Sequence, residues 1–220
     1  MAVTTEPLAA AAGQPGRRSE WLEGWWRHAA ASPSPNHGPR PEGVPVELVV
    51  LHSISLPPGV YGGGEVPAFF ANRLDIDAHP YFAQLRGLAV SAHFLVRRNG
   101  AVLQFVSVDR RAWHAGRSAW RGREGCNDWS VGIELEGLEG DRFEPAQYQA
   151  VRRLLAALRA RWPIAEVVGH EHIAPGRKGD PGAGFDWQAL RADPAWPAGL
   201  GCVIDADAAA GAATGVQPGG

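Results

Sequence analysis

Two histidines and one aspartate stand where rigid elements of the chain are expected to end. His52 falls at the end of one apolar strand pattern, His170 at the end of another, and Asp180 in the loop that follows. Two imidazoles and one carboxylate form a catalytic zinc set, which leaves the fourth tetrahedral position for water or substrate. Each residue alone also has a structural explanation, because strand-end histidines commonly form hydrogen bonds and an aspartate before proline commonly forms a turn. Spacing alone leaves both explanations open.

Glu134 and Glu136 are the candidates for a general base beside such a site. Both alternate with apolar residues in the segment 129–137, so they share one face of the expected strand. A base is needed because an attacking water must lose a proton. Periodicity does not choose between the two glutamates, and a solvated strand carboxylate is an equally ordinary explanation for either.

Lys178 is the only lysine among 21 basic residues, and it lies two residues before Asp180 in the segment RKGDPG. Such an excess of arginine over lysine is typical of proteins encoded by GC-rich genes. A compact ammonium acts as a point charge, whereas a guanidinium is planar and forked, so the two are not interchangeable at a tight site. The alternative is a solvated loop lysine.

Alternating apolar patterns predict the strands that would position these residues. The segment 46–54 alternates up to the turn-forming LPPG and carries His52 near its end. Further short strands are expected over 129–137 and 165–170, and a hairpin over 93–108 with Asn99-Gly100 as a tight primed turn.

Two helices are expected in the second half of the chain. The segment 144–162 has proline at a plausible first helical position and apolar residues at helical intervals, which predicts an amphipathic helix. A short closing helix is expected over 185–193. The mixture indicates an α/β (α+β) protein, a single domain with a central mixed β-sheet flanked by helices.

Composition divides the chain into three parts. Residues 1–43 are rich in Ala, Pro, Gly and Ser, and are expected to be mostly loop, with Trp21, Trp25 and Trp26 pinning a short helix to the body. Residues 44–197 form the predicted zinc-binding domain. Residues 198–220 are dominated by Gly and Ala and are expected to form a flexible tail, because they bury too little apolar surface to offset their ordering entropy.

The same composition excludes several classes of protein. The 220 residues carry 21 basic against 23 acidic side chains, which leaves no basic footprint for nucleic acid. Two cysteines cannot form a disulfide scaffold or a cysteine-rich zinc site. No apolar run approaches the roughly 20 residues that span a bilayer, and the first residues lack the basic start of an export signal. We expect a cytoplasmic protein with no membrane, nucleic-acid or protein partner.

Six separated segments resemble one family. They are LHSISLPPG, AHPYF, SAHFLVRRNG, RRAWHAGRS, GREGCNDWSVGIELEG and GHEHIAPGRKGDPG, in this order over 46–190. Together they are similar to the cytosolic anhydro-N-acetylmuramyl-L-alanine amidases of the AmpD type, which are related to phage T7 lysozyme and the peptidoglycan recognition proteins. The resemblance implies the amidase fold of those proteins. It also implies hydrolysis of the amide bond between the lactyl group of anhydro-N-acetylmuramic acid and L-alanine in peptidoglycan recycling.

The resemblance also assigns roles to individual residues. It places Zn²⁺ on His52, His170 and Asp180, all of which are present. It selects Glu134 as the base that takes a proton from the zinc-bound water and gives it to the leaving amine. It matches Lys178 to a catalytic lysine whose ammonium would stabilise the tetrahedral oxyanion.

Substrate contacts are the part in which this chain departs from the family pattern. Trp113, whose indole could stack on a sugar face, and Tyr81 of the AHPYF segment are candidate contacts with an anhydro-muropeptide. Ser53 replaces a usual asparagine, and Ala89 and Gly125 replace usual arginines, which are natural partners of peptide carboxylates. Two alternatives therefore stand beside the amidase: a non-catalytic muropeptide sensor, and an amidase acting on intact, non-anhydro muropeptides.

Overall fold

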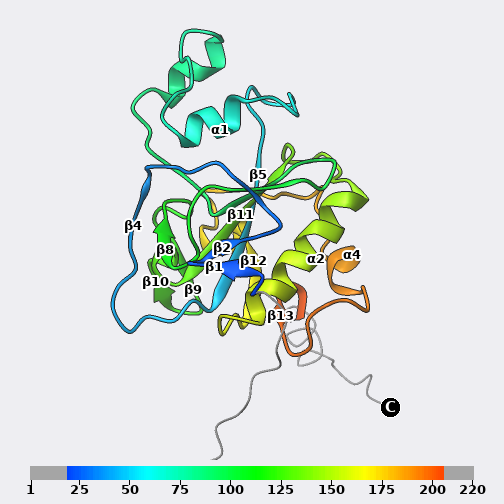
Figure 1. The fold of residues 1–220 in the computed structure, drawn as a ribbon. Coiled ribbons are helices and arrows are strands. Elements are labelled where there is room, and N and C mark those ends of the chain that lie inside the picture. Colours follow the sequence, from blue (N-terminus) through cyan, green and yellow to red (C-terminus); the bar gives the residue numbers. More distant parts are fainter. Residues whose placement is uncertain (1–18, 206–220) are drawn as a thin grey trace, which may run out of the picture.

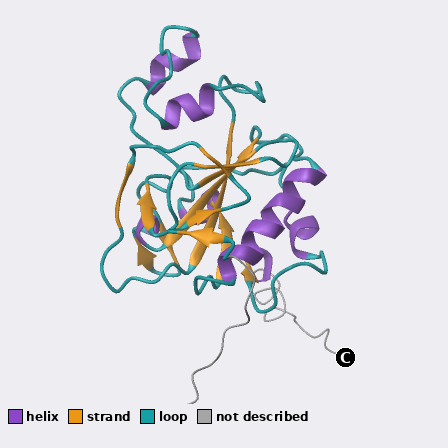
Figure 2. Cartoon of the chain, viewed as in Figure 1, coloured by secondary structure: helices purple, strands orange, loops and turns teal. Residues whose placement is uncertain are grey.

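A seven-stranded mixed sheet forms the centre of the computed structural model, which describes residues 19–205. Its strands are β3 (Ala30–Ala31), β5 (Leu48–Ile54), β6 (Phe94–Val96), β7 (Val102–Gln104), β11 (Ser130–Glu136), β12 (Glu166–Gly169) and β13 (Gly201–Cys202). Their order in the sheet is β13-β12-β5-β11-β6-β7-β3, and every neighbouring pair is parallel except β6 with β7. The predicted central mixed sheet with flanking helices is therefore confirmed (Figures 1 and 2).

Within the described residues, three two-stranded sheets and several helices surround this sheet. The pairs are β1 (Trp21–Leu22) with β2 (Trp25–Trp26), β4 (His37–Pro39) with β8 (Arg110–Ala112), and β9 (Ala119–Trp120) with β10 (Arg123–Glu124). The helices are α1 (Glu65–Phe70), α2 (Pro145–Arg159), α3 (His170–Ile173) and α4 (Trp187–Arg191), with the 3₁₀ helices η1 (Pro80–Leu85) and η2 (Cys126–Asp128). The proline that opens α2 confirms the predicted helix start.

The parallel pairing of β5 with β11 brings the candidate site together. The two strands run in register over seven residues, with Glu134 opposite His52. Because side chains alternate along a strand, both residues project from the same face of the sheet. The opposite face carries Val49, Leu51 and Ile133, which pack in one apolar cluster with the buried side of α2. Helix α2 thus covers one face and leaves the other for the site.

A long excursion separates the end of β5 from the start of β6. It spans residues 55–93 and contains α1 and η1, which lie together at the top of the view in Figure 1. Phe69, Phe70 and Phe82 are buried in an apolar cluster that joins the excursion to the body. The excursion therefore has its own packed interior beside the end of β5.

The short helix expected around Trp21 is replaced by a hairpin. Trp21 pairs with Trp26 across a turn in which Glu23 and Gly24 both have positive φ, a reversal that a helix cannot contain. Trp21 and Trp26 are 6% and 5% exposed and stack on each other at 6.2 Å, so the expected anchoring to the body holds. Downstream, β3 joins the main sheet at its edge. The predicted boundary between an N-terminal extension and the main domain at residue 43 stays a prediction.

The end of the described chain is packed rather than loose. Contrary to the flexible tail expected from 198 onward, β13 pairs with β12, and Leu200, Cys202 and Val203 are buried. These few apolar side chains bury enough surface to dock the segment on the sheet edge. The rest of the predicted tail, 206–220, lies outside the described residues.

The turn of the predicted hairpin also differs in type. Strands β6 and β7 pair as expected, but only Gly100 in the turn has positive φ, whereas a primed turn of type I′ would need it at Asn99 as well. The Gly100 N–H bonds to the Arg97 carbonyl at 2.8 Å, and the Arg97 N–H bonds to the Ala101 carbonyl at 2.8 Å. A longer loop therefore closes this hairpin.

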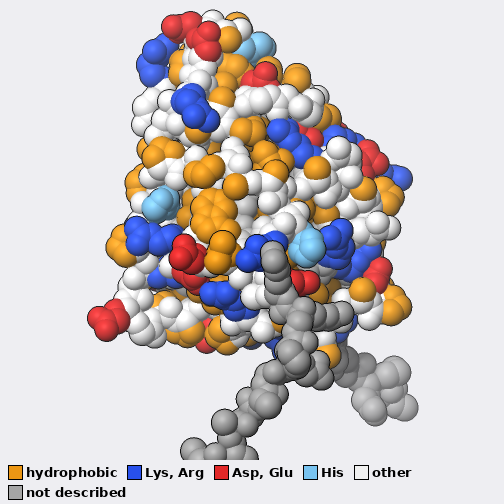
Figure 3. Space-filling model, in the orientation of Figure 1, with side chains coloured by type: hydrophobic (Ala, Val, Ile, Leu, Met, Phe, Trp, Pro, Cys, Tyr) orange, Lys and Arg blue, Asp and Glu red, His pale blue; other side chains and the backbone are white. Residues whose placement is uncertain are grey.

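Acidic and basic side chains are intermixed on the molecular face shown in Figure 3 rather than gathered by sign. This distribution agrees with the near-neutral composition. Within residues 19–205, no helix is long and apolar enough to cross a bilayer.

Candidate active site

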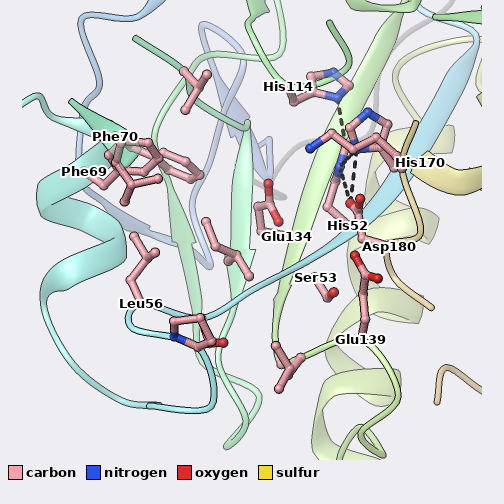
Figure 4. Close-up of a pocket in the computed structure, with 18 of the residues that line it drawn as sticks. His52, Ser53, Leu56, Phe69, Phe70, His114, Glu134, Glu139, His170 and Asp180 are labelled. Atoms are coloured by element: carbon pink, nitrogen blue, oxygen red, sulfur yellow. Dashed lines mark hydrogen bonds and ion pairs between the residues drawn. The ribbon is translucent and has the colours of Figure 1, made fainter. Parts of the chain in front are cut away.

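His52, His170 and Asp180 converge on one point near the carboxyl ends of the central strands β5 and β12 (Figure 4). His52 lies in β5, two residues before its end, and His170 opens α3 immediately after β12 rather than closing the strand. The Nδ1 atoms of the two histidines lie 3.0 Å apart, and Asp180 Oδ2 lies 3.0 Å from one and 3.1 Å from the other. All three residues are buried.

This triangle of donor atoms fits a tetrahedral metal ion. Ligand atoms about 2.0–2.1 Å from zinc lie about 3.3 Å apart in a regular tetrahedron, close to the spacing found here. Burial lowers the pKa of His52 to about 4, which favours the neutral imidazole. Burial would raise the pKa of Asp180, but the close approach of the His170 and His52 rings holds it below the ordinary value. A neutral His52 and an ionised Asp180 offer the lone pairs that metal binding requires.

The second nitrogen of each histidine is also held. His170 Nε2 donates to the Ala115 carbonyl at 3.1 Å, which leaves Nδ1 as the lone-pair atom in the triangle. His52 Nε2 lies 3.0 Å from His114 Nδ1, and His114 Nε2 lies 3.1 Å from Ser130 Oγ. Such outer contacts fix the tautomer and ring orientation of metal-binding histidines. They indicate that the loop containing His114 and Ala115 orients both imidazoles.

The sequence pattern did not identify His114 as a partner of His52. The segment AWHAG suggests only a place on the cleft wall, beside Trp113. Burial, followed by the charges of His52 and His93, holds the pKa of His114 well below its ordinary value, so its ring is neutral. Gly132 on β11 makes room for this ring, since a Cβ there would lie 2.4 Å from the His114 Cγ. No local signal predicts such a contact between segments.

Glu134 and Glu136 have different surroundings although they share a strand face. Glu134 Oε2 is buried and has no hydrogen-bond partner within residues 19–205. Burial, followed by the charge of Asp180, raises its pKa well above the ordinary value, while Lys178 acts in the opposite direction. Glu136 instead accepts hydrogen bonds from Arg97 at 2.5 Å and from the Gly62 N–H at 2.7 Å. Of these two glutamates, it is Glu134 that presents an unengaged carboxylate oxygen at the site within the described residues.

A cleft of about 480 Å³ opens over these residues. Its walls include the predicted residues Trp113, Tyr81 and Lys178, so the structure gathers every predicted site residue at one cleft. Lys178 is exposed in the loop before Asp180, and Tyr81 is 36% exposed on η1 at the rim. Figure 4 shows one wall formed by Leu56, Phe69 and Phe70, opposite the metal-binding group, with further lining from Ser53, Leu85, Leu88, Val90, Leu138 and Glu139.

An adjoining hollow of about 390 Å³ shares Trp113, His114 and Lys178 with the main cleft. Ala89 lines this hollow, in the position where the family pattern has an arginine, and Arg177 lines it as well. Gly125, the second departure, lies outside both, at the start of η2 with φ of 67°. The positively charged side chains that line this hollow are therefore Arg177 and Lys178, from the loop before Asp180.

Comparison with known proteins gives consistent results. A sequence model of the family described as N-acetylmuramoyl-L-alanine amidase matches residues 42–183. The 1,6-anhydro-N-acetylmuramyl-L-alanine amidase AmpD of Citrobacter freundii is 49% identical over 172 residues, covering 77% of this chain and 92% of that protein. AmpD of Escherichia coli K12 is 48% identical over 171 residues, with coverage of 77% and 93%.

Solved structures show the same relationship. The crystal structure of a selenomethionine derivative of AmpD superposes with a TM-score of 0.76 at 50% identity, covering 78% of this chain and 97% of that one. Peptidoglycan recognition protein LE, at 16% identity and a TM-score of 0.53 with coverage of 78% and 96%, shares the fold alone. The family model, the two relatives and the superposition together show that this chain belongs to the N-acetylmuramoyl-L-alanine amidase family.

Proposed function

We propose that this protein is a zinc-dependent amidase that hydrolyses the amide bond between the lactyl group of anhydro-N-acetylmuramic acid and L-alanine. The observation that carries the proposal is the buried triangle of His52, His170 and Asp180, which opens onto a cleft beside Glu134, whose Oε2 has no hydrogen-bond partner within residues 19–205. Relatives that are 48–49% identical over 77% of this chain are named as 1,6-anhydro-N-acetylmuramyl-L-alanine amidases. Hydrolysis of such muropeptides is a step of peptidoglycan recycling, for which we propose a cytoplasmic location.

His52, His170 and Asp180 would hold the metal ion through Nδ1, Nδ1 and Oδ2. Zinc in that position acts as a Lewis acid toward the scissile carbonyl and lowers the pKa of water to about 7. The neutral state of His52 and the ionised state of Asp180 match this role. The three-ligand set leaves room for substrate and water on the cleft side.

Glu134 is the group suited to move the proton. Its register position beside His52 places it next to the metal-binding group, and its Oε2 has no competing partner within the described chain. A carboxylate with a raised pKa is well matched to accept a proton from water and pass it to the leaving amine near neutral pH. Glu134 would thus act first as general base and then as general acid.

Lys178 is placed to stabilise negative charge in the cleft. It lies two residues before Asp180 and lines both the main cleft and the adjoining hollow. An ammonium close to the carbonyl oxygen of the scissile amide stabilises charge that develops only in the transition state. We assign that role to Lys178.

The cleft also fits the substrate class. Trp113 and Tyr81 offer aromatic surface to a muramyl ring, and Arg177 with Lys178 offers cations to a peptide carboxylate in the adjoining hollow. The related AmpDh3 of Pseudomonas aeruginosa, 27% identical with a TM-score of 0.50 and coverage of 81% of this chain and 72% of that one, has a structure described as a complex with an anhydromuramic pentapeptide. We propose the same class of ligand here.

Mass spectrometry of the reaction products tests this function. Purified protein is incubated with an anhydro-muropeptide and with the matching intact muropeptide, each with and without a chelator. We expect free peptide and anhydro-N-acetylmuramic acid from the first substrate, no product after chelation, and no product from a His52→Ala variant. Binding of the muropeptide without cleavage at full zinc loading would identify a sensor, and faster cleavage of the intact substrate would overturn the anhydro specificity.

A further inference from the structure

One loop supplies both contacts that orient the imidazoles of the metal site. His114 and Ala115 are consecutive residues, and each meets the outer nitrogen of a different histidine. His52 Nε2 lies 3.0 Å from His114 Nδ1, and His170 Nε2 donates to the Ala115 carbonyl at 3.1 Å. Any displacement of this loop would therefore alter the orientation of both metal-binding rings.

A single side-chain oxygen accepts from both backbone amides of this pair, while Arg177 Nη2 donates to the Ala115 carbonyl at 2.9 Å. Asn127 Oδ1 accepts a hydrogen bond from the His114 N–H at 3.1 Å and another from the Ala115 N–H at 2.8 Å. A carbonyl oxygen has two lone pairs, so one amide oxygen can satisfy both donors. The two residues whose N–H groups it binds also make the contacts to the metal-binding group, through the His114 ring and the Ala115 carbonyl, so the position of Asn127 affects both His52 and His170.

The element that carries Asn127 is itself fixed. Asn127 lies in η2, where the Asp128 N–H bonds to the Gly125 carbonyl at 2.9 Å. Arg40 belongs to the N-terminal arm, the segment 27–47 between β2 and β5, and donates to the carbonyl of Asp128 at 3.0 Å; the adjacent Cys126 is fully buried. Asn127 thus has a rigid base from which to hold the loop.

We propose that Asn127 is a positioning residue for metal binding, which fixes the His114–Ala115 loop so that both imidazoles present Nδ1 to the ion. The proposal rests on the proposed zinc-binding function. It extends that function to a residue that is not a metal ligand and lines the adjoining hollow rather than the main cleft. Loss of outer contacts of metal-binding histidines commonly weakens metal affinity about 10- to 100-fold. An effect of this size is expected when the Asn127 acceptor is removed.

Zinc affinity, measured by competition with a chromogenic chelator, tests the proposal on three variants and the wild-type protein. Asn127→Leu has nearly the same shape but no acceptor, and we expect its zinc affinity to fall about 10- to 100-fold. Asn127→Asp keeps an acceptor oxygen at the same place, and we expect affinity within about threefold of wild type. Asn99→Leu is the matched control, because Asn99 Oδ1 caps only the Ala101 N–H, in a turn away from the site.

Two further measurements distinguish a positioning role of Asn127 from a general effect of its substitution on folding. Thermal unfolding of each metal-free variant shows whether the fold is intact, and the absorption spectrum of bound Co²⁺ reports the ligand geometry. We expect an altered spectrum for Asn127→Leu and an unaltered one for Asn127→Asp. If the leucine variant does not fold, Asn127→Gln, which moves the oxygen by one methylene, is expected to weaken zinc binding instead.

The possible outcomes are distinct. Wild-type affinity in Asn127→Leu, or equal losses in the aspartate and leucine variants, would overturn the positioning role while leaving the zinc site intact. Absence of zinc binding by the wild-type protein would instead overturn the proposed function. Weakened binding in Asn127→Leu with recovery in Asn127→Asp supports the inference.

Discussion

Glu134 and Glu136 show how surroundings separate two chemically identical residues. Both belong to β11 and both are buried, at 8% and 3% exposure. Arg97 and the Gly62 N–H bind Glu136, whereas Glu134 Oε2 has no partner within residues 19–205. A carboxylate already engaged by a guanidinium is a poor proton acceptor, so the two substitutions are expected to have different consequences.

Glu134→Gln is expected to lower kcat by about 100-fold or more while zinc content stays at the wild-type level. The amide cannot accept the proton, and Glu134 does not belong to the ligand triangle. Glu136→Gln is expected to retain most of the activity but to lose about 2 kcal/mol of unfolding free energy, because the Arg97 ion pair is lost. Steady-state kinetics, metal analysis and denaturant unfolding measure these effects. Equal losses of kcat would contradict the assignment.

The pH dependence of stability gives a second test of Glu134. Its pKa in the folded, metal-free protein is raised by burial, so the neutral form is favoured by folding. The stabilisation is complete below the unfolded pKa and is lost as pH rises toward the folded value, at about 1.4 kcal/mol per pKa unit. Metal-free Glu134→Gln should therefore be more stable than metal-free wild type at pH 7, and this advantage should disappear near pH 4.

Lys178→Ala is expected to lower kcat about 10²- to 10³-fold with nearly unchanged KM and zinc content. The reason is that its ammonium meets charge that develops in the transition state. Lys178→Arg should recover little of the rate, because a planar guanidinium is broader than an ammonium and the site lies beside the metal. Kinetics on both variants decide the role. A large rise in KM at unchanged kcat would make Lys178 a substrate anchor instead.

Among the elements, the N-terminal arm holds a wall of the cleft. Asn36 Nδ2 donates to the Phe70 carbonyl at 3.2 Å, to Asn72 Oδ1 at 2.8 Å and to the Val90 carbonyl at 2.8 Å. Ser34 Oγ donates to the same Phe70 carbonyl at 2.5 Å. The arm therefore ties the end of α1 to the end of the excursion, and Phe70 and Val90 both line the cleft.

Asn36→Ala is expected to raise KM about tenfold and to leave zinc content unchanged. The substitution releases the wall that contacts the substrate but does not touch the metal-binding group; a tenfold change corresponds to about 1.4 kcal/mol. Limited proteolysis should show faster cleavage within residues 55–93 of the variant. Unchanged KM and unchanged proteolysis would show that the excursion is held in place by its apolar cluster alone.

Across the whole molecule, the metal-binding group links parts of the chain that are far apart in sequence. His52 is separated from His170 by 118 residues and from Asp180 by 128. A ligand that binds only the folded state stabilises it by about 4 kcal/mol at a free concentration 1,000 times Kd. For a domain of this size, that corresponds to a rise in Tm of about 10 °C.

Thermal unfolding with zinc and with a chelator measures this linkage. We expect the chelator to lower Tm of the wild-type protein by about 10 °C. His170→Ala should unfold at a temperature that no longer depends on zinc, which controls for binding elsewhere. A wild-type Tm that is insensitive to zinc would contradict the proposed site.

The sequence by itself determined the features that depend on neighbouring residues. These are local properties that appear directly in the sequence pattern: the strands predicted over 46–54 and 129–137 and found at 48–54 and 130–136, the helix that starts at Pro145, and the residue types suited to zinc chemistry. The family resemblance then selected Glu134 over Glu136, which periodicity could not do.

Tertiary structure decided the features that depend on contacts between distant segments. Four features involve such contacts: the docking of the Trp21 hairpin against α2, the packing of 200–203, the binding of Glu136 by Arg97, and the support of both imidazoles by the His114–Ala115 loop. No local pattern specifies them, because the free energy of each arises only when the chain brings its partners together. The residue types were therefore set by sequence, and their surroundings by the fold.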